Sequence, residues 1–145
     1  MSCRVVVTGL GFITPIGNDR SAVIASLREL RHGFESVDWL PECGVSLLGT
    51  IKEFDLREFN QAKWSWPVQY SIPRETLRSL SPHGVYALCA VEQALAESGL
   101  TRSDLTDGQT GLFCASAGSP RYLTHHMNAM LTTNGQILHP WCVAR

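Results

Sequence analysis

The stretch RVVVTGLGFITPIG, residues 4–17, is the most informative part of this sequence. It begins within a nearly continuous apolar, β-branched run, Cys3–Thr8, which is typical of a strand buried on both faces of a mainly parallel sheet. A glycine-rich loop, Gly9–Gly17, follows this run. The stretch therefore predicts an α/β fold that opens with a strand and a loop.

A first helix is predicted directly after this loop. Asn18 or Asp19 is expected to cap it, because their side chains accept hydrogen bonds from the free N–H groups of a first turn. Gly33 ends the helical pattern, whose apolar positions follow the spacing i, i+4, i+7 at Val23, Leu27 and Leu30. Such a helix supplies part of the cover that a strand buried on both faces requires.

Two further helices carry a cap signal of another kind. Ser81-Pro82 and Ser119-Pro120 each place a hydroxyl before a proline at the first helical position, where the missing N–H costs nothing. The earlier helix is expected to end at about Ser98, before Gly99, with a mostly apolar stripe at Val85, Leu88, Cys89, Glu92 and Leu95. The later one is expected to close at Asn134-Gly135, after a stripe at Leu123, Met127, Met130 and Leu131.

The remaining segments are shorter and more irregular. Thr110–Ala115 predicts a second buried strand, Val45–Ile51 is a candidate third strand, and Asp55–Asn60 is a candidate helical turn. Prolines and glycines break residues 34–80 into pieces, and the aromatic side chains gathered there are Trp39, Trp64, Trp66 and Tyr70. Their expected role is to pin an irregular excursion by aromatic packing.

The bulk composition is that of a globular protein without a preference for nucleic acid or membrane. Apolar residues make up 44% and charged residues 17%, and the 12 basic and 13 acidic side chains give a net charge of -1. The apolar run Val5–Val7 is too short for a signal peptide or a membrane span. The five cysteines include no CxxC pair, which is typical of reduced thiols. We therefore expect a cytoplasmic protein.

The Gly9-Leu10-Gly11 turn is also compatible with the start of a dinucleotide-binding loop. Glycines there let the backbone approach a pyrophosphate at a helix N-terminus. The match ends after Gly11, and Pro15 lies where the first helical turns would be, although residues before a proline avoid helical angles. No second strand ending in an acidic residue follows about 20 residues later. A small nucleotide-binding module is therefore the least favoured alternative.

A more specific resemblance is to the β-ketoacyl-acyl-carrier-protein synthases, or ketosynthases, of the thiolase-like superfamily. Val5–Gly11, the turn Thr14–Asn18 and the capped helix after it resemble the opening of that family. Arg78–Leu100 resembles its long helix, and Gly111–Gly118 resembles the strand and small-residue turn that follow. The resemblance implies a thiolase-like layered α/β fold, of which residues 1–145 would be an incomplete N-terminal half, ending before the nucleophile position.

The resemblance also implies an activity whose catalytic residues lie outside this sequence. Ketosynthases hold an acyl group on a cysteine at a helix N-terminus and condense it with a decarboxylating malonyl thioester. Two later histidines, with backbone amides, stabilise the enolate and the oxyanion. None of these side chains has a matching position up to Arg145, so the chain has no assigned catalytic residue, cofactor or metal ligand and is expected to be inactive alone. A non-catalytic partner of the chain-length-factor type stays open as an alternative.

Two pairs of residues are candidates for a functional contribution. Ala117 and Gly118 match a place where the family lines the acyl pocket, although small residues there also simply permit a strand-to-helix turn. Arg74 and Arg78 precede the long helix, where related enzymes meet the acidic acyl carrier protein; solvated arginines at a helix end are the alternative. The expected partners are the acyl carrier protein and, for the intact protein, a second copy.

The other reactive side chains are not assigned to a site: the cysteines receive no catalytic role, and the two adjacent histidines are interpreted as solvated or interfacial. Cys114 is interpreted as a small buried residue in the middle of a strand, and Cys142 is not promoted to a nucleophile. His125 and His126 are adjacent, so on a helix they point about 100° apart and do not share a metal through i, i+4 geometry.

Overall fold

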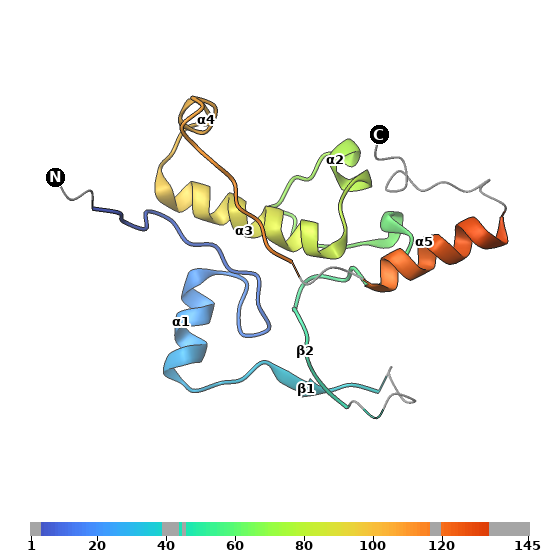
Figure 1. Cartoon of the computed structure of the whole chain (residues 1–145). Coiled ribbons are helices and arrows are strands. Elements are labelled where there is room, and N and C mark those ends of the chain that lie inside the picture. The colour runs from blue at the N-terminus through green and yellow to red at the C-terminus, as the bar shows by residue number, and fades with distance from the viewer. Residues whose placement is uncertain (1–3, 39–43, 45, 117–119, 134–145) are drawn as a thin grey trace. The chain divides into compact units, whose positions relative to one another are not determined.

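The computed structural model describes residues 4–38, 44, 46–116 and 120–133 (Figure 1). Its elements, in chain order, are α1 (Arg20–Arg28), β1 (Phe34–Ser36), β2 (Leu47–Gly49), η1 (Gln61–Lys63), α2 (Arg74–Arg78), α3 (Pro82–Ser98), α4 (Arg102–Leu105) and α5 (Pro120–Thr132). The chain divides into two compact units. The first unit is Met1–Phe54 with Tyr86–Gly111, and the second unit is Asp55–Val85 with Leu112–Arg145.

The described residues form a two-stranded antiparallel sheet. Strands β1 and β2 pair in the register Phe34↔Gly49, Glu35↔Leu48 and Ser36↔Leu47. The Glu35 carboxylate accepts hydrogen bonds from Thr50 and Lys52, which follow strand β2 in the chain. The predicted strand at Val45–Ile51 is thus confirmed over its central residues, but its partner was not predicted, and the pairing is antiparallel rather than parallel.

The two strands predicted with the strongest apolar pattern are absent from the described residues. Residues 4–8 and 110–115 are neither helix nor strand, and the side chains of Val5 and Phe113 are 93% and 97% exposed. The prediction of buried strands was therefore wrong here, and Cys114 is exposed rather than buried. An apolar run forms a strand only when a neighbouring strand takes its N–H and C=O groups, and no described segment does so for either run.

Helix α1 confirms the predicted cap and corrects the predicted end. The Asp19 carboxylate accepts a hydrogen bond of 2.9 Å from the Ala22 N–H. Within α1, the Ser26 hydroxyl is buried and donates to the Ile16 carbonyl at 2.7 Å. The helix ends at Arg28, and Leu30, predicted to belong to its apolar stripe, instead has a φ of 54° and is 90% exposed. The chain therefore leaves the helix earlier than the apolar spacing indicated.

Helix α3 matches its predicted bounds, from Pro82 to Ser98, and Gly99 follows with a φ of 71°. Two residues of the predicted stripe, Val85 and Cys89, are fully buried. Burial raises the pKa of the Cys89 thiol to about 11, because the thiolate loses its hydration in an apolar environment. The i, i+4 apolar spacing therefore identified the buried face of this helix correctly.

The last helices are α4 and α5. Thr101 and Asp104 form a capping box at the start of α4. Helix α5 occupies the predicted segment, although its expected cap, Ser119, lies outside the described residues. Leu123, at 63% exposed, shows that the predicted apolar stripe of α5 faces outward. Among the described residues, no helix combines the length and the apolar character that crossing a membrane requires.

Candidate functional site

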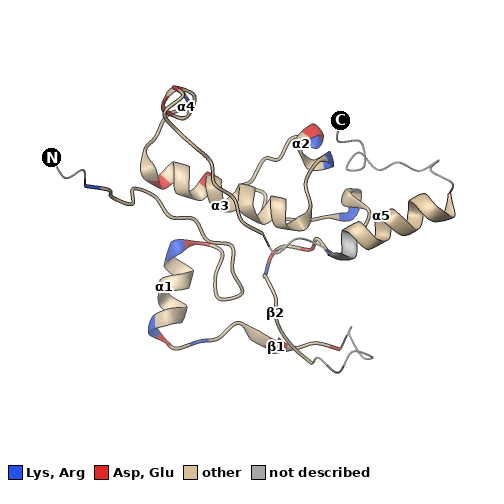
Figure 2. Ribbon diagram, viewed as in Figure 1, with Lys and Arg blue, Asp and Glu red and all other residues tan. Residues whose placement is uncertain are grey.

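Helix α2 carries the two arginines that the sequence singled out. Pro73 stands at its N-cap position, and the helix ends at Arg78, with Ser79 as the C-cap residue. Arg74 and Arg78 are four residues apart, so they lie on the same face of the helix, and both are exposed. Figure 2 shows basic segments, together with an acidic one, on α2. The short helix therefore presents two guanidinium groups together.

A hollow with a volume of about 370 Å³ lies beside these arginines. Helix α2 contributes Arg74, Leu77 and Arg78 to its walls, and the segment before it contributes the rest of the lining: Phe59, Asn60, Gln61 and Ala62. The lining thus combines two positive charges, two carboxamides and apolar side chains. This composition suits a ligand surface that has both an apolar part and a negative charge.

Gln61 holds the two walls of the hollow together. Its Nε2 donates to the carbonyl oxygens of Leu77, at 3.1 Å, and Leu80, at 2.9 Å. Leu77 lies in the last turn of α2, where backbone oxygens have no partner inside the helix, and Leu80 follows the helix. One side chain of η1 is therefore hydrogen-bonded both to the last turn of α2 and to the backbone just after it.

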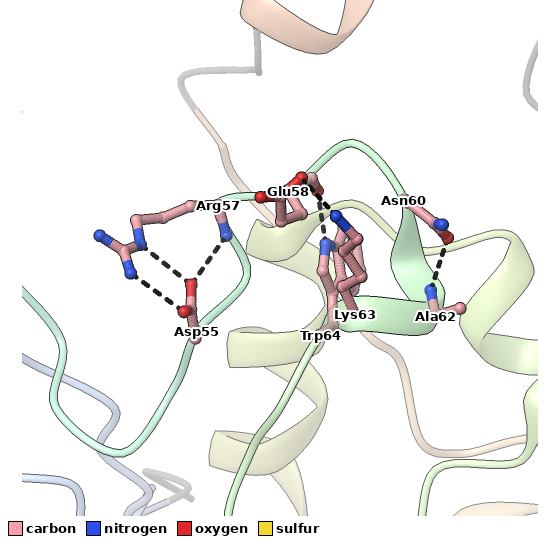
Figure 3. Close-up of polar contacts among 7 residues, drawn as sticks. All are labelled: Asp55, Arg57, Glu58, Asn60, Ala62, Lys63 and Trp64. Carbon is pink, nitrogen blue, oxygen red and sulfur yellow. Dashed lines mark hydrogen bonds and ion pairs between the residues drawn. The ribbon is translucent and has the colours of Figure 1, made fainter.

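The segment that forms the other wall is organised by short polar contacts (Figure 3). Backbone hydrogen bonds of 2.9 and 3.0 Å join Asp55 to Ser65 and close the segment into a loop. The indole of Trp64 is buried and donates to the Glu58 carbonyl at 2.6 Å. The Asn60 side chain accepts the Ala62 N–H at 3.0 Å and caps η1. The helical turn predicted at Asp55–Asn60 was therefore wrong: it begins after Asn60, whose side chain starts it.

The predicted aromatic packing is confirmed in part of this segment. Besides Trp64, Tyr70 is buried, and the indole of Trp66 donates to the Tyr70 carbonyl at 2.9 Å. Each indole thus fills apolar space and also satisfies a backbone carbonyl. Trp39, the fourth aromatic residue of the prediction, lies outside the described residues.

The charges of the second unit differ in whether they have a partner. Arg57 makes two hydrogen bonds of 2.9 and 3.0 Å to the carboxylate of Asp55, whose pKa the guanidinium holds below its usual value. The carboxylate of Glu58 lies 3.8 Å from the Lys63 ammonium. Among the described residues, neither Arg74 nor Arg78 has an ion-pair partner. The two charges at the hollow are thus available to an anion.

An aromatic stack adjoins the hollow. The rings of Phe59 and His125 are 3.8 Å apart between centroids and inclined by only 11°. Phe59 belongs to the lining of the hollow, and His125 belongs to α5. The stack therefore fixes one wall of the hollow against another helix of the same unit, and it gives His125 a packing role that the sequence did not identify.

Of the two predicted pairs of site residues, the structure describes only one. Arg74 and Arg78 are brought together at one hollow. Ala117 and Gly118, the predicted acyl-pocket residues, lie outside the described residues. The sequence missed Phe59 and Gln61, because their role depends on contacts 16 or more residues away in the chain. A local sign that could have indicated a turn at this point is Asn60, because asparagine is a preferred residue at the start of a helical turn.

The alternative nucleotide site at Gly9-Leu10-Gly11 does not have the geometry of a phosphate cradle. A cradle needs free N–H groups at the start of a helix. Here the Leu10 N–H donates to the Glu97 carboxylate at 2.8 Å, and the Phe12 N–H donates to the Gln93 carboxamide at 2.9 Å. Both N–H groups are thus taken by side chains of α3, and the structure argues against a nucleotide-binding role for this turn.

Comparison with known proteins identifies the family. The sequence model of the β-ketoacyl synthase N-terminal domain matches residues 2–142. The chain is 30% identical over 145 residues to 3-oxoacyl-acyl-carrier-protein synthase 1 of Escherichia coli strain K12, an alignment that covers 98% of this chain and 33% of that protein. It is also 31% identical over 111 residues to the Haemophilus influenzae synthase 1 and 30% identical over 115 residues to the Synechocystis synthase 2, with 75% of this chain and 24% of each relative aligned.

These alignments cover 75% to 98% of this chain but only 24% to 33% of each relative, so the chain spans about a third of their length or less. The family match over residues 2–142 includes the glycine-containing opening run, helix α3 and the segments that line the hollow. The chain belongs to the β-ketoacyl synthase family, and it corresponds to the N-terminal domain of that family.

Proposed function

We propose that this chain is the N-terminal part of a β-ketoacyl-acyl-carrier-protein synthase with a thiolase-like layered fold. The intact enzyme would condense an enzyme-bound acyl group with malonyl-acyl carrier protein: loss of carbon dioxide creates the enolate, which attacks the acyl thioester and releases the enzyme thiol. The family match over residues 2–142 and the names of the curated relatives support this proposal. Residues 1–145 would supply scaffold, and Ala117 and Gly118 would line the acyl pocket.

The described residues support a more specific role, namely contact with the acyl carrier protein. The single observation that carries it is the hollow lined by Arg74 and Arg78. The guanidinium groups of these two residues have no ion-pair partner among the described residues. Carboxylates on the carrier protein would meet the guanidinium groups, and an apolar side chain beside them would fill the hollow. Complementary charge of this kind speeds encounter and fixes orientation.

A binding titration tests this role. Fluorescently labelled holo acyl carrier protein is titrated with the 145-residue chain at low ionic strength, and binding is followed by anisotropy. Arg74→Glu and Arg78→Glu should each weaken binding by about fivefold to tenfold, and salt should weaken binding by the unmodified chain. Arg4→Glu, an equal charge change at an exposed position in the first unit, is the matched control and should change little. Equal effects of all three reversals would refute a specific contact on α2.

The catalytic part of the proposal has its own test. The 145-residue chain should form no β-ketoacyl product from acyl- and malonyl-acyl carrier protein, whereas a longer chain that continues to the nucleophile and both histidines should form it. Product formation is read by mass spectrometry of the carrier-bound thioester. Pairing of two copies, also part of the proposal, is read from the sedimentation of the longer chain. A longer chain that carries the nucleophile but forms no product would contradict the proposed activity.

A further inference from the structure

The segment between the N-terminal apolar run and α1 lies against one face of α3, and its contacts follow a regular pattern. The Leu10 N–H donates to the Glu97 carboxylate at 2.8 Å, and the Phe12 N–H donates to the Gln93 Oε1 at 2.9 Å. The Gln93 Nε2 also donates to the carbonyls of Phe12, at 3.2 Å, and Asn18, at 2.7 Å. We call these hydrogen bonds the α3 ladder.

The ladder forms because the distance between alternate residues of the segment matches the distance between side chains four positions apart on α3. Alternate residues of an extended chain are separated by about 6.6 to 6.8 Å. Side chains four positions apart on a helix are separated by about 6 Å along its axis, since each residue rises 1.5 Å. Gln93 and Glu97 therefore meet the N–H groups of every second residue, at Phe12 and Leu10. Helix side chains here take the place of the carbonyl groups of a neighbouring strand.

Gly9 and Gly11 alternate along the chain with Leu10 and Phe12, whose N–H groups donate in the ladder, and they bring the chain close to the helix. A Cβ atom at Gly9 would overlap the carbonyl oxygen of Ala94, and a Cβ atom at Gly11 would overlap that of Ala90. These glycine contacts are again two residues apart on the chain and four apart on the helix. The small side chains of Ala90 and Ala94 let the backbone reach this surface, and only glycine fits opposite them.

Together these features exclude other alignments of the chain on α3. A shift by two residues in one direction would place Val7 opposite Ala94, and a shift in the other direction would place Ile13 opposite Ala90. Either side chain would collide with a helix carbonyl. A shift by a single residue would turn the N–H groups away from the ladder, because successive residues of an extended chain face opposite ways.

We propose that the α3 ladder and the two glycine contacts fix the register of residues 4–12, so that α3 determines which way each side chain of the N-terminal run faces. The sequence signature of this device is Gly-x-Gly at residues 9–11 together with Ala-x-x-Gln-Ala-x-x-Glu at residues 90–97. In this chain the paired glycines serve helix contact rather than phosphate binding. The inference concerns the first unit alone and does not depend on the proposed function.

Amide hydrogen exchange of the 145-residue chain, read residue by residue by NMR, tests this proposal. The Leu10 and Phe12 amides should exchange at least tenfold more slowly than the Val6 amide, which has no partner among the described residues. Gln93→Leu should remove the protection of Phe12, and Glu97→Gln should retain that of Leu10 because its carbonyl oxygen still accepts. Glu92→Gln on the same helix is the control. Equally fast exchange at all three amides would overturn the proposal.

A double variant tests the register directly. Val7→Gly combined with Gly11→Ala moves the glycine pair by two residues, so Gly9 would face Ala90 and protection should move from Leu10 and Phe12 to Thr8 and Leu10. Continued protection of the Cys89 amide, in the buried part of α3, would show that the helix is intact in each variant. If Phe12 stays protected and Thr8 does not gain protection, the glycines do not select the register and the proposal fails.

Discussion

The Glu97 carboxylate accepts the Leu10 N–H at 2.8 Å, across 87 positions of the chain, and it also pairs with Arg20. The hydrogen bond from Leu10 and the contacts with Arg20 hold the pKa of Glu97 below its ordinary value. A carboxyl group with a lowered folded-state pKa stabilises the fold above its unfolded pKa, near 4.5, and this contribution is lost as the pH falls through the folded value. The anchor of the N-terminal segment is therefore sensitive to acid.

Glu97→Gln should consequently flatten the dependence of stability on pH. Glutamine still accepts the Leu10 N–H, but it carries no proton-linked charge, so the variant should lose less stability than the unmodified chain between pH 5 and pH 3. Urea unfolding midpoints measured across this range give the two slopes. Glu92→Gln serves as the control for removing a charge from α3. Parallel slopes for the unmodified chain and Glu97→Gln would contradict the assignment.

Leu30→Gly should stabilise the end of α1. The Arg31 N–H donates to the Ser26 carbonyl at 2.9 Å, and the Leu30 N–H donates to the Leu27 carbonyl at 3.3 Å, which is the Schellman pattern with leucine in the position that favours glycine. Relief of a left-handed conformation is worth about 1–2 kcal/mol, offset by about 0.5–1 kcal/mol for the entropy of glycine. We expect a net gain of about 0.5–1 kcal/mol in the free energy of unfolding.

The matched control for this change is Leu30→Ala, which removes the same exposed side chain but keeps a Cβ atom at a φ of 54°. It should give little or no gain in denaturant unfolding. Equal gains from alanine and glycine would show that the exposed side chain, rather than the backbone angle, is the source of the effect.

Cys89 and Cys114 should differ strongly in their reactivity toward alkylating reagents. The Cys89 thiol is buried, and burial raises its pKa to about 11, so little thiolate forms at pH 8 and the reagent has no access to it. Cys114 is exposed. Iodoacetamide at pH 8 should modify Cys114 within minutes and leave Cys89 unmodified until urea is added, as read by peptide mass spectrometry. Modification of Cys89 at the rate of Cys114 would show that α3 does not bury it.

Trp64→Phe should destabilise the loop that forms one wall of the hollow lined by Arg74 and Arg78. The Trp64 side chain is 7% exposed, and its indole N–H donates to the Glu58 carbonyl at 2.6 Å. Phenylalanine leaves that carbonyl without its donor, at a cost of about 1–2 kcal/mol. Val68→Ala, in the same segment but with a side chain 99% exposed, is the control and should stay within about 0.5 kcal/mol. Urea unfolding followed by circular dichroism compares the two; equal effects would contradict a structural role for the indole.

Local signals in the sequence were sufficient where the determining contacts are local. The Asp19 cap, the Ser81-Pro82 start of α3 and the Gly99 stop were predicted because each depends on residues within one helical turn. Val85 and Cys89 were placed on the buried face for the same reason. The end of α1 was missed, because the backbone leaves the helix at Leu30 although the apolar spacing continues.

The candidate site was predicted only at the level of its charged residues. The sequence singled out Arg74 and Arg78 as residues before the long helix, and helix α2, which was not predicted, places them four positions apart on one face. Phe59 and Gln61 join them through contacts with His125 and with the carbonyls at the end of α2, which no local pattern indicates. The sequence therefore identified the charges, and the packing around Gln61 created the hollow.

The sequence by itself determined the family and the presence of helices α1, α3 and α5, and it singled out the two arginines, because caps, apolar spacing and the run Arg4–Gly17 are properties of neighbouring residues. Only the tertiary structure decided what Gly9 and Gly11 are for. The apolar run before these two glycines predicts a strand, and the Gly-x-Gly sequence is compatible with a phosphate-binding loop. In the structure, the two glycines lie against helix α3, about 80 residues later in the chain. A glycine in the sequence indicates only that the backbone comes close to another group. The tertiary structure shows which group that is.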